Sequence, residues 1–269
     1  MEVTTIEAED YVLKLDKLKV ELKEVFKLSA MFCLLWFFSN YFYNYGLAFA
    51  SVTSSVILSN TSPMWVYIFG LSCLVPAVMR DKFNWIKALM VVISITGFVI
   101  IAIQDFKADP STTETGWQQA LGDGLTLISA VFYGLYATFL KVKVPEEKEE
   151  SFRFTVFLGF VGLINDVILL PLFPIFNWIG LETFAWPNGQ TTLLLTVNAL
   201  IGTVLSDYCW ARSVVLLGPL VTTLGITLTF PLSLLVDLIG KHKSFTWLYY
   251  VGSAFIFAAF GVISFVDYR

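Results

Sequence analysis

The stretch SVTSSVILSNTSPMWVYIF, residues 51–69, places serines, threonines, one asparagine and a proline inside an apolar segment. The part SVTSSVILSNTSP, which ends at Pro63, is matched by PLVTTLGITLTFP at residues 219–231, which also places hydroxyl side chains among apolar residues and ends on a proline. The sequence SNYFYN at 39–44 is matched by SDYCWA at 206–211, at nearly the same separation along the chain. The chain therefore contains an internal repeat, which begins with these paired segments.

The composition is that of a membrane protein. Of 269 residues, 57% are hydrophobic, 14% are charged and 25 are phenylalanine, well outside the usage of soluble domains. A membrane-spanning helix needs about 20 mostly apolar residues. We predict an all-α, polytopic membrane helix bundle with about eight spans near residues 27–48, 52–79, 83–106, 121–141, 153–176, 190–215, 219–239 and 245–267.

The N-terminal segment is polar but patterned. Leu15, Leu18, Leu22 and Val25 recur at helical spacing between lysines, which favours an amphipathic helix along the membrane surface. A solvated linker is the alternative. No cleaved signal peptide is indicated before the first span.

Basic residues indicate the orientation of the spans. Lys107, Lys241 and Lys243 lie on one side of the eight predicted spans, and the other 14 of the 17 Lys and Arg residues lie on the opposite side. By the positive-inside rule both termini face the cytosol. Spans one to three then run opposite to spans six to eight, so the two copies are inverted, as in many secondary transporters. Chance similarity between apolar segments is the alternative reading.

Several motifs resemble a known family. They are GDGLTLISAVFYGLYATFLK at 122–141, FVGLIND at 160–166, LSDYCW at 205–210 and LTFPLS at 228–233. Together they resemble the drug/metabolite transporter superfamily with EamA-type repeats, and more narrowly the F branch of solute carrier family 35 and its fungal vacuolar-membrane relatives. The resemblance implies ten helices in two inverted five-helix units, with a substrate cavity between them.

Against that pattern the first two helices have no counterpart here. The expected organisation is a charged segment 1–26, a partial first unit 27–106 with three helices, a loop 107–120, and a complete second unit 121–269 with five helices. A shortened first unit would leave polar groups of its spans incompletely covered, which predicts instability or a homo-oligomer.

The polar residues of the repeated stretches allow two interpretations. Ser51, Ser55, Ser59 and Ser62 form a stripe of small residues that lets a neighbouring helix approach closely. Alternatively, residues of the two stretches line a polar cavity at the repeat interface. The substrate-binding candidates on this second interpretation are Asn60, Thr61, Thr227 and Thr229.

Charged groups inside spans are stronger candidates, because they are costly in a bilayer. Asp207 lies about eight residues, or about 12 Å, from the cytosolic end of its span, near the middle of a core about 30 Å thick. Asn40 is its counterpart in the first copy. Asn165 and Asp166 lie near the middle of the fifth span. An ion pair that fixes helix packing is the alternative role for Asp207.

The sequence gives little support for catalysis or metal binding. The single histidine, His242, excludes a His-based triad or a His/Cys metal site, and the three cysteines all fall inside spans. We therefore expect no enzyme activity, no cofactor and no nucleic-acid partner. The predicted function is secondary transport of a small organic solute across an endomembrane, with vacuole or lysosome favoured over Golgi. The alternative is a non-transporting membrane protein that associates with, or regulates, a full-length partner.

The charge asymmetry makes a direct prediction. Epitope tags at both termini should be digested by protease added to the cytosolic side of sealed vesicles, whereas a tag in the loop around Glu182 should be protected. Protection of both terminal tags would overturn the orientation, and with it the inversion of the two copies.

Overall fold

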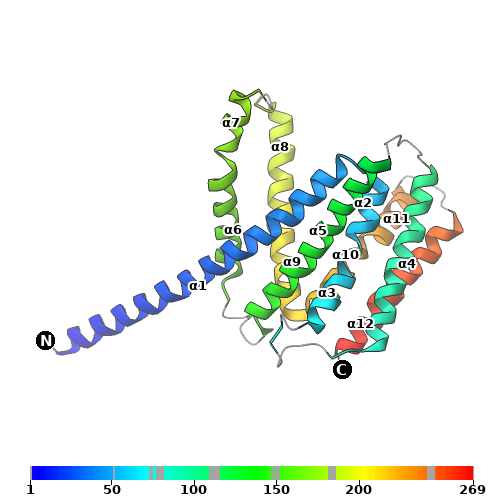
Figure 1. Cartoon of the computed structure of the whole chain (residues 1–269). Helices are drawn as coiled ribbons and strands as arrows, with labels where there is room; N and C mark the ends of the chain where they lie inside the picture. Colours follow the sequence, from blue (N-terminus) through cyan, green and yellow to red (C-terminus); the bar gives the residue numbers. More distant parts are fainter. Residues whose placement is uncertain are drawn as a thin grey trace. The chain divides into compact units, whose positions relative to one another are not determined.

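The computed structural model describes residues 2–50, 52–72, 75–76, 82–108, 116–146, 149, 152–180, 186–240 and 246–268, and these residues form helices joined by short connections (Figure 1). In chain order the helices are α1 (Glu2–Leu47), α2 (Val52–Ser59), α3 (Ser62–Leu71), α4 (Trp85–Ala108), α5 (Gly116–Lys143), α6 (Phe154–Leu169), α7 (Leu172–Trp178), α8 (Gly189–Val197), the π-helix η2 (Asn198–Leu205), α9 (Ser206–Leu217), α10 (Pro219–Thr227), α11 (Thr229–Gly240) and α12 (Trp247–Tyr268).

The predicted class, an all-α polytopic membrane bundle, is confirmed. Among the described residues, six helical stretches are long and apolar enough to cross a membrane: Glu21–Leu47, Trp85–Ile103, Trp117–Lys143, Phe154–Trp178, Gly189–Leu217 and Trp247–Asp267. The two other expected segments, 52–79 and 219–239, contain pairs of shorter helices, α2 with α3 and α10 with α11. Residues 73–74 and 77–79 of the first lie outside the described part.

The N-terminal segment is helical, because α1 runs without interruption from Glu2 to Leu47. This favours the helical alternative over a linker for residues 2–26. The predicted position of this segment on the membrane surface stays a prediction.

The chain divides into two compact units by its contacts. Unit 1 comprises Met1–Leu34 and Ser151–Cys209, and unit 2 comprises Leu35–Glu150 and Trp210–Arg269. In unit 1, α1 packs on α6: the Ser29 hydroxyl donates to the Phe157 carbonyl at 3.0 Å, and the rings of Phe32 and Phe157 meet edge to face at 5.1 Å. These units follow spatial contacts, and the sequence-based boundaries stay predictions.

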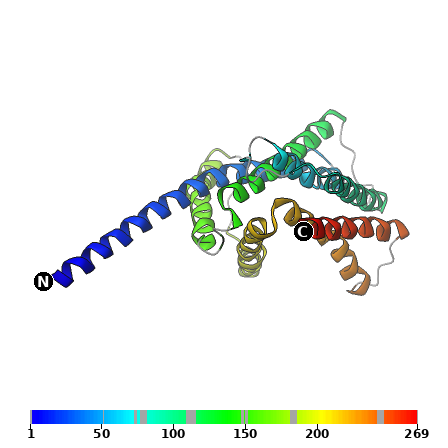
Figure 2. The same cartoon turned by 90° about the horizontal axis from the view of Figure 1, so that it is seen from below.

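The core of unit 2 lies where α4 and α12 run side by side (Figure 2). Backbones approach closely here, since a Cβ added to Gly97 would lie 2.6 Å from the Gly252 carbonyl oxygen. Around this contact the buried side chains are Phe98, Ile101, Ala102, Tyr249 and Ile256. The Phe230 ring of α11 meets the Phe98 ring edge to face at 4.4 Å, so α11 also packs against this core.

Helix α5 is the second packing centre of unit 2, because α2 and α3 both pack against it. A Cβ on Gly134 would lie 2.9 Å from Cβ of Trp65 in α3. Ser55 of α2 is fully buried, and the Thr126 hydroxyl lies 3.5 Å from its hydroxyl. The interpretation of the serine stripe as a surface for close helix approach is supported at Ser55 and at buried Ser62.

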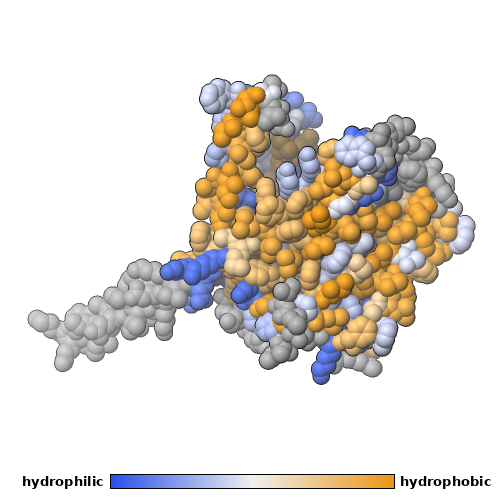
Figure 3. Space-filling model, in the orientation of Figure 1, coloured by the Kyte–Doolittle hydropathy of each residue, from blue (hydrophilic) through white to orange (hydrophobic). Residues whose placement is uncertain are grey.

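On the face drawn in Figure 3, much of the described surface is apolar and is coloured orange. None of the 18-residue apolar window in the stretch Gly189–Leu217 is buried, and Leu193, Leu194 and Ile201, which belong to unit 1, are each more than 60% exposed. Side chains of this kind face lipid or another protein in a membrane.

The contact between Gly97 and Gly252 yields a stability prediction. Gly252→Ala should lower the melting temperature of the purified protein, because overpacking a close helix contact costs about 1–3 kcal/mol. A Cβ at Gly252 would lie 2.6 Å from the Gly97 carbonyl oxygen and 2.7 Å from Ile101. Gly261→Ala, on the same helix, is the control, because no atom lies within 4 Å of its added Cβ. Equal melting temperatures for the two variants would contradict this packing.

Candidate functional site

Two helices of unit 2 are interrupted at corresponding places. The α2–α3 segment breaks at Asn60 and Thr61, and the α10–α11 segment breaks at Leu228. Pro63 and Pro231 follow the breaks, and both are fully buried. Proline lacks a backbone N–H and displaces the carbonyl one turn earlier, so each break frees backbone acceptors inside the membrane.

Side chains next to the breaks bond to backbone carbonyls of the helical turn just before them. Asn60 Nδ2 donates to the Val56 carbonyl at 2.8 Å, and the Thr61 hydroxyl donates to Leu58 at 2.6 Å. At the second break the Thr227 hydroxyl donates to Leu224 at 2.6 Å, and the Thr229 hydroxyl donates to Ile226 at 2.8 Å. Each of the four predicted cavity residues therefore donates a side-chain hydrogen bond to a nearby backbone carbonyl. Their roles as substrate ligands stay predictions. The hydroxyl oxygens can still accept hydrogen bonds, and the Asn60 amide retains its oxygen and its second N–H.

Asp207 lies in the first turn of α9 and is half-buried. It follows directly on η2, the eight-residue π-helix Asn198–Leu205, and π-helical turns occur often at functional sites. Asn40 is exposed, and its Nδ2 donates to the Trp36 carbonyl at 2.8 Å. Asp207 belongs to unit 1 and Asn40 to unit 2, so their predicted relation by symmetry stays a prediction.

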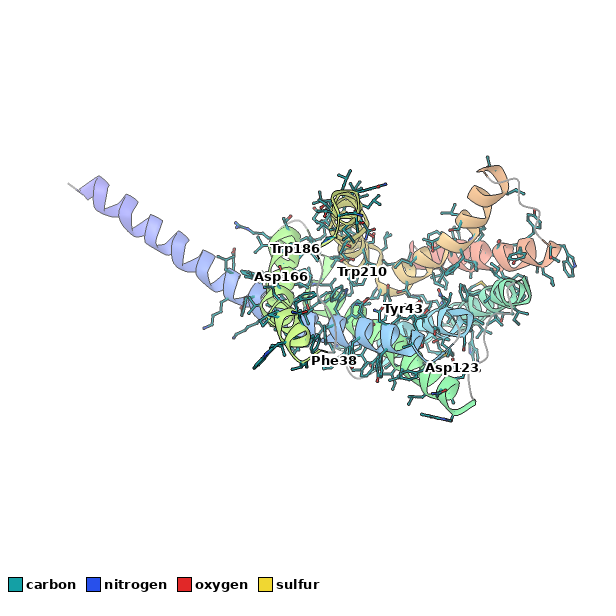
Figure 4. All side chains as sticks on the ribbon, turned by 90° about the horizontal axis from the view of Figure 1, so that it is seen from above. Phe38, Tyr43, Asp123, Asp166, Trp186 and Trp210 are labelled. Carbon is teal, nitrogen blue, oxygen red and sulfur yellow. The ribbon has the colours of Figure 1, made fainter. Side chains whose placement is uncertain are left out.

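Asn165 and Asp166 are neighbours on α6 with different surroundings. Asn165 is half-buried, and its Nδ2 donates to the Val161 carbonyl at 3.2 Å. Asp166 is exposed on the same helix (Figure 4). An exposed carboxylate in a spanning helix needs water or a partner, so Asp166 remains a candidate.

A carboxylate that the sequence analysis did not nominate is Asp123. It lies near the start of α5 inside the candidate span Trp117–Lys143, is half-buried, and accepts a hydrogen bond from the Ser54 hydroxyl of α2. Figure 4 marks it on α5. Beside it, a Cβ on Gly122 would lie 2.5 Å from the Ala50 backbone nitrogen. The sequence did contain a signal for this residue: in the Gly122-Asp123-Gly124 motif, two small residues flank a charge inside a predicted span.

Charged side chains join the C-terminal end of α5, and the residues that follow it, to α9. The Lys141 ammonium donates to the Val215 carbonyl in the last turns of α9 and lies 4.0 Å from Glu146. A cation at a helix C-terminus is favourable. Arg212 of α9 pairs with Glu149, whose side chain is only 6% exposed. Sequence reasoning missed this pair, because the EEKEE run that contains Glu149 reads as a solvated loop.

Three aromatic rings gather on the same side of α5. Tyr133 and Tyr136 lie 5.0 Å apart between ring centroids, and Trp210 of α9 lies 5.4 Å from Tyr136. The Trp210 indole N–H donates to the Tyr133 hydroxyl at 3.0 Å. The described part of the chain contains no cluster of three or more His, Cys, Asp or Glu that could hold a metal ion.

The hydrogen bond between Ser54 and Asp123 can be measured. Ser54→Ala and Asp123→Ala should each lower the melting temperature, and the double variant should show a coupling of about 0.6 kcal/mol, the average for interhelical hydrogen bonds in membranes. Asp123→Asn should retain most of the stability, because the amide oxygen still accepts. Asp166→Asn is the control, since Asp166 is exposed. Strict additivity of the two alanine variants would show that the bond contributes nothing.

Comparisons with known proteins point in one direction. The SLC35F family, Solute carrier family 35, matches residues 14–266. An "uncharacterized vacuolar membrane protein" of Saccharomyces cerevisiae is 37% identical over 92% of this chain and 63% of its own length. Solute carrier family 35 member F5 of Bos taurus is 32% identical over 97% of this chain and 48% of its own length. The chain thus spans between about half and two thirds of these relatives.

A solved crystal structure shares the fold. It superposes with a TM-score of 0.62 at 13% sequence identity, covering 93% of this chain and 88% of its own. At this identity the likeness concerns the arrangement of helices alone.

Proposed function

The chain belongs to solute carrier family 35, and from this membership we propose that it is a secondary transporter that moves a small organic solute across an endomembrane by alternating access. Membership of a solute carrier family also agrees with the expectation that the chain is not an enzyme. The solute itself is to be found by experiment.

The observation that carries the proposal is the pair of helix breaks at Asn60–Thr61 and Leu228. Secondary transporters with repeats bind their solutes near discontinuous helices, because a break exposes backbone groups and helix ends at membrane depth. Here the breaks fall at corresponding positions of the two sequence copies, each before a buried proline. A helix bundle with a purely structural role has no need for two matched interruptions.

Asp207 is the proposed coupling residue. Few carboxylates lie in the predicted spans, and Asp207 is half-buried beside η2. On this proposal its carboxylate exchanges a proton or meets a cationic solute, and Asn40 is its neutral counterpart in the other copy. Asn165 and Asp166 have secondary roles on the same solute path.

The proposed location is the vacuolar or lysosomal membrane. Support comes from the yeast relative, whose name places that protein in the vacuolar membrane. The Golgi is the second choice, and both termini are proposed to be cytosolic because of the charge asymmetry.

A second function is favoured by one observation, the apolar segment 189–206, in which every residue is exposed. A surface of this kind can bind another membrane protein as well as lipid. On this alternative the chain does not transport by itself and instead associates with, or regulates, a longer relative.

Reconstitution separates the two functions. The purified chain is screened by thermal shift against small organic solutes, and each solute that stabilises it is then tested for uptake into proteoliposomes. Uptake by this chain alone supports the transporter. Stable association with a longer relative, without uptake by this chain, supports the regulatory alternative.

Asp207→Asn should abolish proton-coupled uptake while the melting temperature stays nearly unchanged, because the amide keeps the shape and most hydrogen bonds of the carboxylate. Asp166→Asn, on exposed Asp166, should have a milder effect. The two measurements are made on the same proteoliposome preparations. Wild-type uptake by Asp207→Asn would remove Asp207 from the site, and a joint loss of uptake and stability would return it to a structural role.

A further inference from the structure

Among the described residues, four buried polar side-chain atoms have no hydrogen-bond partner: one is the Ser264 hydroxyl of α12, and the other three come from three different helices of unit 2. These three are the indole Nε1 of Trp65 in α3, the hydroxyl of Thr138 in α5 and the hydroxyl of Thr222 in α10. These three helices contact one another pairwise. The side chains of Thr138 and Thr222 are each 7% exposed. Each of the three contacting helices α3, α5 and α10 therefore contributes one buried polar atom without a hydrogen-bond partner.

The two threonines depart from the rule that the other buried threonines follow. Thr126 donates to Gly122 at 3.0 Å, Thr223 to Pro219 at 2.6 Å and Thr227 to Leu224 at 2.6 Å, each to a carbonyl of its own helix. A hydroxyl in a membrane helix normally makes this bond, because lipid offers no other acceptor. Thr138 and Thr222 leave the bond unmade, although a carbonyl one turn earlier is available to each.

Two of the three residues lie near an end of their helix. Thr138 is five residues, or about 7.5 Å, before the end of α5 at Lys143, and Thr222 is three residues, or about 4.5 Å, after the start of α10 at Pro219. Trp65 lies against Gly134, one turn before Thr138 on α5. An unsatisfied buried polar atom costs about 1–3 kcal/mol, so three among these contacting helices represent a substantial cost that an occupant would offset.

We propose that Trp65, Thr138 and Thr222 form a binding site for an uncharged hydroxyl or carbonyl group of the transported solute. The indole N–H donates to such a group, and the two hydroxyls both donate and accept. The three atoms carry no charge, and enclosing an ion among them would be far more costly than enclosing a neutral polar group. The proposal rests on the transport function and specifies which part of the solute is recognised.

The first test measures access from water and needs no transported solute. Thr138→Cys, Thr222→Cys and Thr223→Cys are made singly in a full-length variant whose Cys33, Cys73 and Cys209 are alanine. Each is reconstituted in proteoliposomes and treated with a small, uncharged, water-soluble methanethiosulfonate. Cysteines at 138 and 222 should react about tenfold faster than cysteine at 223, because a solute path opens repeatedly to water. Equal rates would overturn the proposal, whether or not the chain transports.

The second test distinguishes a solute site from a water site. Glucose, uridine and nicotinamide serve as uncharged probes with hydroxyl or carbonyl groups, and gluconate serves as a charged comparison. At least one uncharged probe should slow labelling at positions 138 and 222 while gluconate leaves it unchanged. Fast labelling that no uncharged probe slows would show that the site holds water only, and the proposal would fail.

A stability measurement guards against a structural explanation. Without solute, Thr138→Val and Thr222→Val should leave the melting temperature unchanged or raise it, because each removes an unsatisfied hydroxyl. Thr223→Val is the matched control and should lower it, since the Thr223 hydroxyl is bonded to Pro219. Lower melting temperatures for all three variants would show that Thr138 and Thr222 have structural partners and would overturn the site.

Discussion

The close approach of helix backbones at glycines is the constraint on which unit 2 depends. Lipid tails are as apolar as leucine, so helices in a membrane gain little from burying apolar surface and associate through packing instead. In unit 2 this packing occurs at Gly97 with Gly252, at Gly122 with Ala50, and at Gly134 with Trp65. A side chain at any of these glycines would separate the helices, and the interhelical polar contacts beside them would lengthen.

Short polar side chains have two different uses around these contacts. At the helix breaks, the side chains of Asn60, Thr61, Thr227 and Thr229 donate to carbonyls of the preceding helical turn, so these donors are satisfied inside the bilayer. Between helices, Ser39 bonds to the Ser129 carbonyl at 3.0 Å, and Ser54 bonds to Asp123. The residues best placed to bind a solute are those that serve neither purpose.

The sequence predicted the helices well and the partners of polar groups poorly. Apolar length alone locates α4, α5 and α12 within a few residues, because a span must match the bilayer thickness. Pro63 and Pro231 mark the breaks, because proline removes a backbone donor. The pairing of Arg212 with Glu149, and of Asp123 with Ser54, depends on which helices meet. Periodicity reports the face of a helix and not its neighbour, so these contacts had no signal in a single sequence.

The π-helix η2 lets the helical stretch that carries Asp207 accommodate an extra residue. Each residue of an α-helix advances the side-chain direction by about 100°, and a π-helical turn accommodates one residue more than an α-helical turn. Loss of a single residue within Asn198–Leu205 would let a π-helical turn close as an α-helical turn, so Asp207 and the later side chains of α9 would keep nearly the same direction relative to α8. Relatives with one residue fewer in this segment would therefore still present a side chain in the direction of Asp207, so the proposed coupling position tolerates a length change of one residue.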